Sequence, residues 1–179
     1  MIEAYYRKAL SGLPRLFAVT CICISVCLIP GDILAAADIS IHLVSISIDG
    51  VNNANGGSHA PAVSADGRFV VFLSEASNLV SDDDNGLLDV FVHDIWTRTT
   101  TLVSRNYDGG PANGEPSRPS ISADGDFIVY SSDASNMILD DTNDASDVFI
   151  YNRLTGETEL ISVNSDEQIG NKNSFTRRP

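Results

Sequence analysis

The stretch of sequence that decides the fold is Pro61–Asp94, which reads PAVSADGRFVVFLSEASNLVSDDDNGLLDVFVHD. It returns 58 residues later as Pro119–Asn152, which reads PSISADGDFIVYSSDASNMILDDTNDASDVFIYN. Aligned without a gap, the two stretches are identical at 17 of 34 positions, and most differences keep the chemistry of the side chain. Self-similarity at a fixed period indicates a repeated structural unit. We therefore expect two repeats, of about 61–118 and 119–176.

Each repeat contains four short segments with the patterns of β-strands. In the first repeat they are Ala62–Ser64, Arg68–Ser74, Asp89–Ile95 and Thr99–Ser104. The second segment holds a continuous apolar run, which indicates burial on both faces, whereas the fourth alternates as a strand at an edge does. Asp66-Gly67 between the first two supplies the left-handed backbone of a tight hairpin. Four antiparallel strands in about 60 residues are typical of a propeller blade, so we predict an all-β fold, a partial β-propeller of about two blades.

Three features of each repeat carry a resemblance to a known family. They are the Ser-Ala-Asp-Gly hairpin, the apolar strand after it, and the Asp-Val-Phe strand that leads into a Thr-Arg or Thr-Gly turn. Together they resemble the repeats of TolB-like, WD-like β-propellers over nearly all of Ile41–Pro179. The resemblance implies the propeller fold and leaves the function open, because one fold hosts many functions.

The number of blades raises the question of how the ring is completed. Propellers typically have four to eight blades, so two cannot close a ring. The resemblance implies that Ile39–Ile48 is an N-terminal outer strand that completes a blade begun elsewhere. We therefore expect the chain to be an N-terminal fragment of a longer protein. The alternative is a ring assembled from several two-blade chains in head-to-tail contact.

A removable export signal is predicted over residues 1–37. A basic start is followed by the apolar run Leu16–Ile29, the helix-breaking Pro30-Gly31 and the small residues Ala35–Ala37, the order found in secretory signals. At 1.5 Å per residue the apolar run covers about 21 Å of a hydrocarbon layer of roughly 30 Å, which favours a cleaved signal over the alternative of a retained membrane anchor. We expect a secreted or periplasmic protein, with residues 38–179 as the mature propeller segment and no stable membrane insertion after cleavage.

Charge and cysteine content exclude several classes of function. The chain has 24 acidic and 11 basic residues, a net charge of −13, which disfavours binding to a nucleic-acid backbone. All three cysteines, Cys21, Cys23 and Cys27, lie inside the signal. The mature segment therefore has no disulfide, thiolate metal site or cysteine nucleophile.

The Asp-rich loop of each repeat is the main candidate for a site. Carboxylate and amide oxygens recur there at the same spacing, and Ca²⁺ takes about six to eight oxygen ligands of this kind. The candidate metal ligands are Asp82, Asp83, Asn85, Asp89, Asp140, Asp141, Asn143 and Asp147. The EF-hand pattern is not met, because the twelfth residue counted from Asp82 is His93. The interpretation that we favour is structural: Asp and Asn side chains that hydrogen-bond nearby backbone N–H groups also hold a loop between strands.

No catalytic residues are predicted. The sequence has no Gly-x-Ser-x-Gly motif, and His59 and His93 do not recur in the second repeat, so we expect surface or packing roles for them. Asp66 and Asp124 precede glycines and are expected in turns. Trp96 is either an exposed ring for stacking on a ligand or, as we expect, a ring packed against the adjacent blade.

These observations predict an exported binding or scaffold module without catalysis of its own. Its partner would be a protein or other ligand at the loop-bearing face of the propeller, with calcium as the one candidate cofactor, in a stabilising role. A nucleic-acid partner is not expected. The alternative function is the N-terminal part of a propeller-containing hydrolase or lyase, whose active-site residues would converge from several blades.

Overall fold

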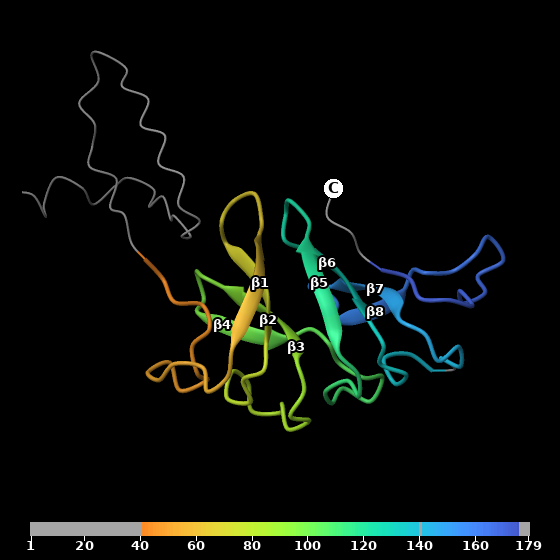
Figure 1. Cartoon of the computed structure of the whole chain (residues 1–179). Coiled ribbons are helices and arrows are strands. Elements are labelled where there is room, and N and C mark those ends of the chain that lie inside the picture. Colours follow the sequence, from red (N-terminus) through yellow and green to blue (C-terminus); the bar gives the residue numbers. More distant parts are fainter. Residues whose placement is uncertain (1–40, 140, 176–179) are drawn as a thin grey trace, which may run out of the picture. The chain divides into compact units, whose positions relative to one another are not determined.

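The computed structural model of the protein describes residues 41–139 and 141–175, and its regular structure within them is entirely β (Figure 1). One sheet holds β1 (Ser58–Val63), β2 (Phe69–Ser74), β3 (Asp89–Asp94) and β4 (Thr99–Leu102). The other holds β5 (Pro116–Ile121), β6 (Phe127–Ser132), β7 (Asp147–Asn152) and β8 (Glu157–Leu160). Each sheet is antiparallel with its strands in chain order, which confirms the all-β, blade-like fold.

The two sheets, named here the first blade and the second blade, are copies of each other. Every strand of the second blade begins 58 residues after its counterpart in the first. All six residues of β2 are buried, as its continuous apolar run predicts. The first strand begins at Ser58, ahead of the repeat start expected at Pro61, because the chain is already extended and paired there.

Tight hairpins join the first two strands of each blade. Gly67 and Gly125 have φ values of 73° and 79°, the left-handed conformation that glycine adopts without strain. The Asp66 carboxylate accepts hydrogen bonds from Ser64 Oγ (2.6 Å) and from the backbone N–H of Arg68 (3.0 Å). Asp124 accepts the equivalent bonds in the second blade. Both aspartates are therefore turn residues, as expected.

A bulge interrupts the first strand of each blade, which the sequence analysis did not predict. The pairing register shifts between His59 and Ala62 in β1 and at the equivalent place in β5. Ala60 and Arg118, each followed by proline, take positive φ values of 52° and 46°. β1 and β5 are edge strands of their sheets, and a bulge with a proline is a common means of blocking further pairing at such an edge.

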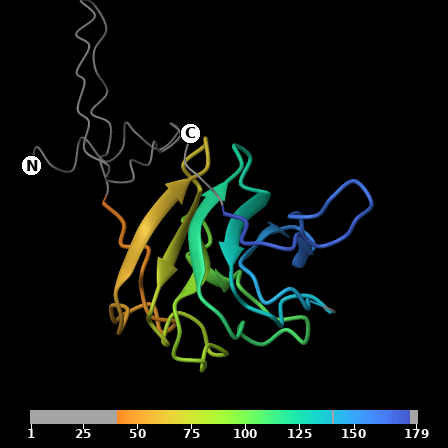
Figure 2. The ribbon, with the colours of Figure 1, turned by 45° about the vertical axis from the view of Figure 1, so that its right-hand side comes forward.

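The core lies between the two blades. Figure 2 shows the two sheets side by side. Alternate residues of β2 and β6 contribute to it, as the two-residue period of a strand requires. The core residues from the first blade and its following loop are Phe69, Val71, Leu73, Val90, Val92, Val103 and Ala112. Those from the second blade and its loops are Ile128, Tyr130, Ala134, Met137, Phe149 and Tyr151. The blades therefore stabilise each other by burying facing apolar surfaces.

The expected N-terminal outer strand is not formed in the described part of its range, residues 41–48. Ile46 makes only an isolated bridge with Asn53, and the Ile48 N–H donates to the Asn78 carbonyl (2.8 Å). Residues 105–111 form the same kind of loop after β4. The strand is absent because the backbone groups of residues 41–48 hydrogen-bond within their own loop and to the first blade, and no strand among the described residues pairs with them.

The predicted export signal, its three cysteines and the candidate ligand Asp140 lie outside the described residues. Within the described part of the chain, no helix is long and apolar enough to cross a membrane.

Candidate functional site in the Asp-rich loops

Asp89 is the centre of a buried hydrogen-bond network at the start of β3. Its Oδ1 accepts a hydrogen bond from Ser104 Oγ (2.5 Å), and its Oδ2 accepts one from Asn85 Nδ2 (2.9 Å). The same Asn85 amide donates to the carbonyl of Ala112 (3.0 Å), and Ser104 Oγ accepts from the Val90 N–H (3.0 Å). Burial raises the pKa of Asp89 to about 6, although the hydrogen bonds from Ser104 and Asn85 act to lower this pKa. The network joins the Asp-rich loop, the end of β4 and the loop between the blades.

The second blade repeats this network at the expected offset. Asp147 accepts hydrogen bonds from Ser162 Oγ (2.6 Å) and Asn143 Nδ2 (2.7 Å), and Asn143 also donates to the Gly170 carbonyl (2.8 Å). In addition, Asn143 Oδ1 accepts from the Ala145 N–H (2.9 Å), as Asn85 Oδ1 does from Leu87. The side-chain-to-backbone bonds expected of a structural loop are therefore present in both copies.

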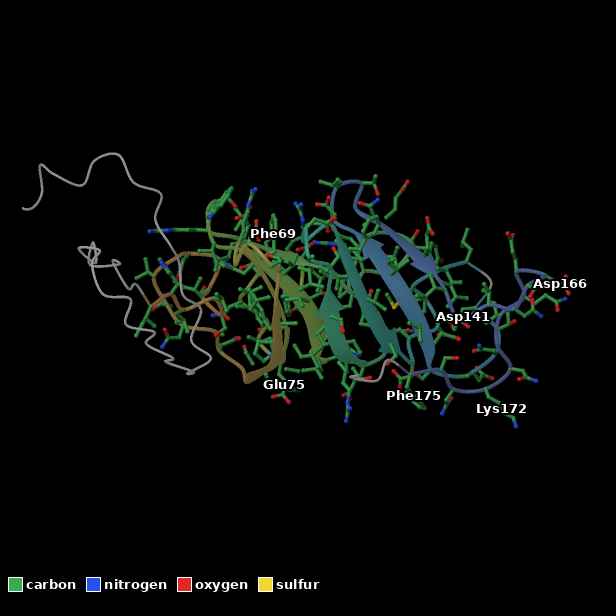
Figure 3. The ribbon with its side chains drawn as sticks, turned by 90° about the horizontal axis from the view of Figure 1, so that it is seen from above. Phe69, Glu75, Asp141, Asp166, Lys172 and Phe175 are labelled. Atoms are coloured by element: carbon green, nitrogen blue, oxygen red, sulfur yellow. The ribbon has the colours of Figure 1, made fainter. Side chains whose placement is uncertain are left out.

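Asp83 and its copy Asp141 occupy a different position in the loops. Asp83 is only 7% exposed, yet no hydrogen-bond donor among the described residues reaches its carboxylate. Oδ1 of Asp141 is buried and has no hydrogen-bond partner in the described part of the chain. Figure 3 labels the position of Asp141. Burial raises the pKa of both carboxyl groups, and neighbouring carboxylates raise it further: Asp84 and Asp82 act on Asp83, and Asp147 acts on Asp141.

Asp82 is paired with a basic side chain. Its Oδ2 lies 2.5 Å from Arg105 Nη1, and this hydrogen bond lowers the pKa of Asp82. The same nitrogen donates to the Gly109 carbonyl. Of the candidate ligands in the first blade, Asn85 is hydrogen-bonded to Asp89, the charge of Asp83 acts on Asp89, and Asp82 is paired with Arg105. No three acidic, histidine or cysteine side chains among the described residues converge as a ready-made metal cage.

The long loops gather at one end of the blades, and tight turns close the other end (Figure 1). These loops are residues 75–88, 103–115, 133–146 and 161–175. Their described residues include 11 acids but only two bases, Arg105 and Lys172. The loop end is therefore strongly acidic.

The tight-turn end carries a feature that the sequence analysis did not predict correctly. The Trp96 ring is 59% exposed, and the Arg68 guanidinium of the same blade lies 4.5 Å from its centroid. Arg68 also binds Asp94 through two nitrogens, the shorter contact being 2.6 Å. The expectation that Trp96 packs against the adjacent blade is therefore wrong. The alternation of polar and apolar residues does not reveal this stack, because its members lie in different turns.

His93 and His59 have the roles expected from the sequence. His93 is buried in β3, with Nδ1 3.0 Å from Thr100 Oγ1 on the neighbouring strand β4. His59 is exposed on β1. Neither histidine lies in the Asp-rich loops.

Comparisons with known proteins add a similarity of fold. No protein-family model matches the chain, and no curated protein matches it. The structure is similar to part of the crystal structure of TolB from Acinetobacter baumannii, with a TM-score of 0.37 and 19% sequence identity. The match covers 64% of this chain and 22% of the TolB chain, so this chain corresponds to only a small part of that protein. Its own two sheets establish that the chain carries two successive four-stranded blades of the β-propeller type.

Proposed function

We propose that the protein is an exported binding or scaffold module whose contact surface is the acidic loop end of its blades. The observation that carries this proposal is the repeated network around Asp89 and Asp147, which holds the long loops by the same hydrogen bonds in both blades. Loops that are fixed before a partner arrives lose less conformational entropy on binding. A rigid β-scaffold that presents such loops is a common arrangement of binding surfaces.

The charge of the loop end indicates the chemistry of the partner. The described loops hold 11 acids and two bases, so this surface attracts a protein with a basic patch or a cationic ligand. The same charge disfavours nucleic acid as a partner, because a phosphate backbone is also negative. Calcium bound in the loops would add to their rigidity, but the binding role does not depend on it.

Export fits this role, since the surface would meet its partner outside the cytoplasm. Support for export comes from the sequence of residues 1–37, with its basic start, apolar run and small residues before Asp38. The module binds without catalysis of its own, and the propeller-containing hydrolase or lyase is the competing function.

Site-specific photo-crosslinking tests the proposal. A photoreactive residue at Asp84, exposed in the loop end, is expected to crosslink a partner in the extracytoplasmic fraction. The matched position Thr155, exposed in the tight turn between β7 and β8, is expected to give no crosslink. Charge reversal at Asp108 and Glu115 on a neighbouring loop should abolish the Asp84 crosslink, because the attraction is electrostatic.

Two outcomes would contradict this function. Equal crosslinking from Asp84 and Thr155 would mean that the loop end is not the contact surface. Turnover of ester or glycoside substrates by the purified chain, lost on substitution of loop carboxylates, would favour the enzyme.

A further inference from the structure

We infer that the second blade docks a β-sheet unit of a partner protein, built like the second blade itself, on the apolar face opposite to the first blade. This surface, named here the open face, consists of Phe127 and Val129 of β6, Val148 and Ile150 of β7, and Ile161 after β8. Cross-strand pairing, as between Val129 and Ile150, sets these side chains on one side of the sheet. The inference is independent of the proposed binding function, because the open face is a flank of the second blade and not its loop end.

The internal repeat indicates what covers such a face. The first blade has the same surface 58 residues earlier, where it forms part of the core between the blades: Phe69, Val71, Val90, Val92 and Val103. The second blade covers that surface, with β5 lying against β1 and β2. Phe69 is 3% exposed and Val103 0%, whereas their copies Phe127 and Ile161 are 42% and 44% exposed. The surface that a neighbouring blade covers in the first copy is therefore uncovered in the second.

The open face keeps the apolar character of its covered copy. All five of its residues are apolar, as are their five counterparts in the first blade. Burial of apolar surface is favourable by about 25 cal/mol per Å², and two sheets pack face to face through such rows of side chains. Single exposed apolar residues are ordinary, but a contiguous apolar surface across two strands is typical of a contact site.

Contacts at the tight-turn end show which unit fits the open face. Between the two blades, the Ala65 N–H donates to the Ala123 carbonyl (2.9 Å), and the Arg153 guanidinium carbon lies 3.9 Å from the Phe69 ring centroid. The corresponding groups of the second blade are the exposed Ala123 N–H and the exposed Phe127 ring. Among the described residues, no backbone carbonyl accepts from this N–H and no cation lies over this ring. The partner unit therefore presents a turn carbonyl to Ala123 and an arginine to Phe127.

A second copy of this chain has no free surface of the required kind. The second blade packs on the first through the side that carries Tyr130 and Phe149, and in any other copy that side is already occupied. The first blade carries Phe72 and Phe91 at the same positions of the repeat, and these are only 2% and 0% exposed. The occupant is therefore a blade-like unit of a different protein.

An extended chain tests the inference with a unit of the proposed kind. In this chain a second copy of residues 118–175 replaces residues 176–179, so that the added blade follows the second as the second follows the first. The Ala123 amide is expected to exchange with deuterium as slowly as the Ala65 amide, whereas in the unextended chain it should exchange faster than Ala65. The double substitution Phe127→Glu, Ile161→Glu in the original second blade should abolish the added protection. Leu154→Glu, at an exposed site in the turn between β7 and β8, should retain it.

Circular dichroism of the unextended variants shows whether their two blades remain folded, as the exposure of the substituted residues predicts. Three results would overturn the docking surface. Unchanged exchange of the Ala123 amide in the extended chain would show that the open face does not accept a blade. Equal protection in the folded Phe127→Glu, Ile161→Glu variant would place the contact elsewhere. Dimers of the unextended chain in analytical ultracentrifugation, lost in the same variant, would show that a second copy is the occupant.

Discussion

The guanidinium carbon of Arg153 in the second blade lies 3.9 Å from the ring centroid of Phe69 in the first blade. Arg68 covers the same ring at 4.6 Å, and Figure 3 labels Phe69 where the first sheet adjoins the second. A Cβ at Gly125 would overlap this ring, so the absence of a side chain there is required for the approach. Phe69 is thus a main contact between the two blades at their tight-turn end.

Phe69→Ala should therefore destabilise the protein strongly. Phe69 is 3% exposed in the core between the blades, and removal of a buried Phe ring typically costs about 3–5 kcal/mol. Phe127 stands at the same position of the repeat but is 42% exposed, so Phe127→Ala should cost less than half as much. The free energy of unfolding in urea measures both. Equal costs would show that the contact between the blades does not contribute as described.

Ser104→Ala should weaken the loop network. Ser104 Oγ donates to Asp89 and accepts from the Val90 N–H, so its loss leaves two buried groups unpaired. Each unpaired group costs about 1–3 kcal/mol, which for two groups predicts a loss of roughly 2–6 kcal/mol in unfolding free energy. Ser162→Ala, its copy, should have a smaller effect because Ser162 is partly exposed. A loss under 1 kcal/mol for Ser104→Ala would contradict the importance of the network.

Glu167→Gly should stabilise the protein. Glu167 has a φ of 59°, and the equivalent positions in the two earlier copies of its loop are Gly50 and Gly109, with φ of 69° and 90°. A non-glycine residue in this conformation costs about 1–2 kcal/mol, of which glycine recovers most. Gly109→Ala is the reverse control and should lower the melting temperature. Destabilisation by Glu167→Gly would show that the positive φ is not adopted in solution.

The ion pair of Arg68 and Asp94 predicts a pH dependence. Burial raises the pKa of Asp94, but hydrogen bonds from Arg68 and from the backbone of Trp96 outweigh it and lower this pKa to about 2, below the ordinary 3.8. A lowered pKa contributes stability above the ordinary value, which is lost as the pH falls through the folded-state value. The difference in unfolding free energy between the wild type and Asp94→Asn should reach its full value above about pH 4 and should disappear as the pH falls toward about 2. A constant difference across this window would contradict the ion pair.

Local turn and strand patterns were enough to predict the blades, because they depend on neighbours in the sequence. Asp66-Gly67 predicts its hairpin since few other pairs adopt that backbone, and the run in β2 predicts burial on both faces. Tertiary relationships were not predictable in this way. Nothing in the sequence distinguishes Asp82, paired with Arg105, from Asp83, buried without a donor. The bulges at Ala60 and Arg118 could have been predicted from one feature of the sequence, the proline that follows each of these residues within a strand.

Amide hydrogen exchange of the folded chain tests most directly the claim that the loop end is fixed before a partner binds. The N–H groups of Leu87 in the first blade and Ala145 in the second, which donate to Asn85 and Asn143, should exchange as slowly as those of β2 and β6. Protection of these loop amides at the level of the strands is the expected result. Exchange at the rate of an unstructured peptide would contradict a preformed binding surface.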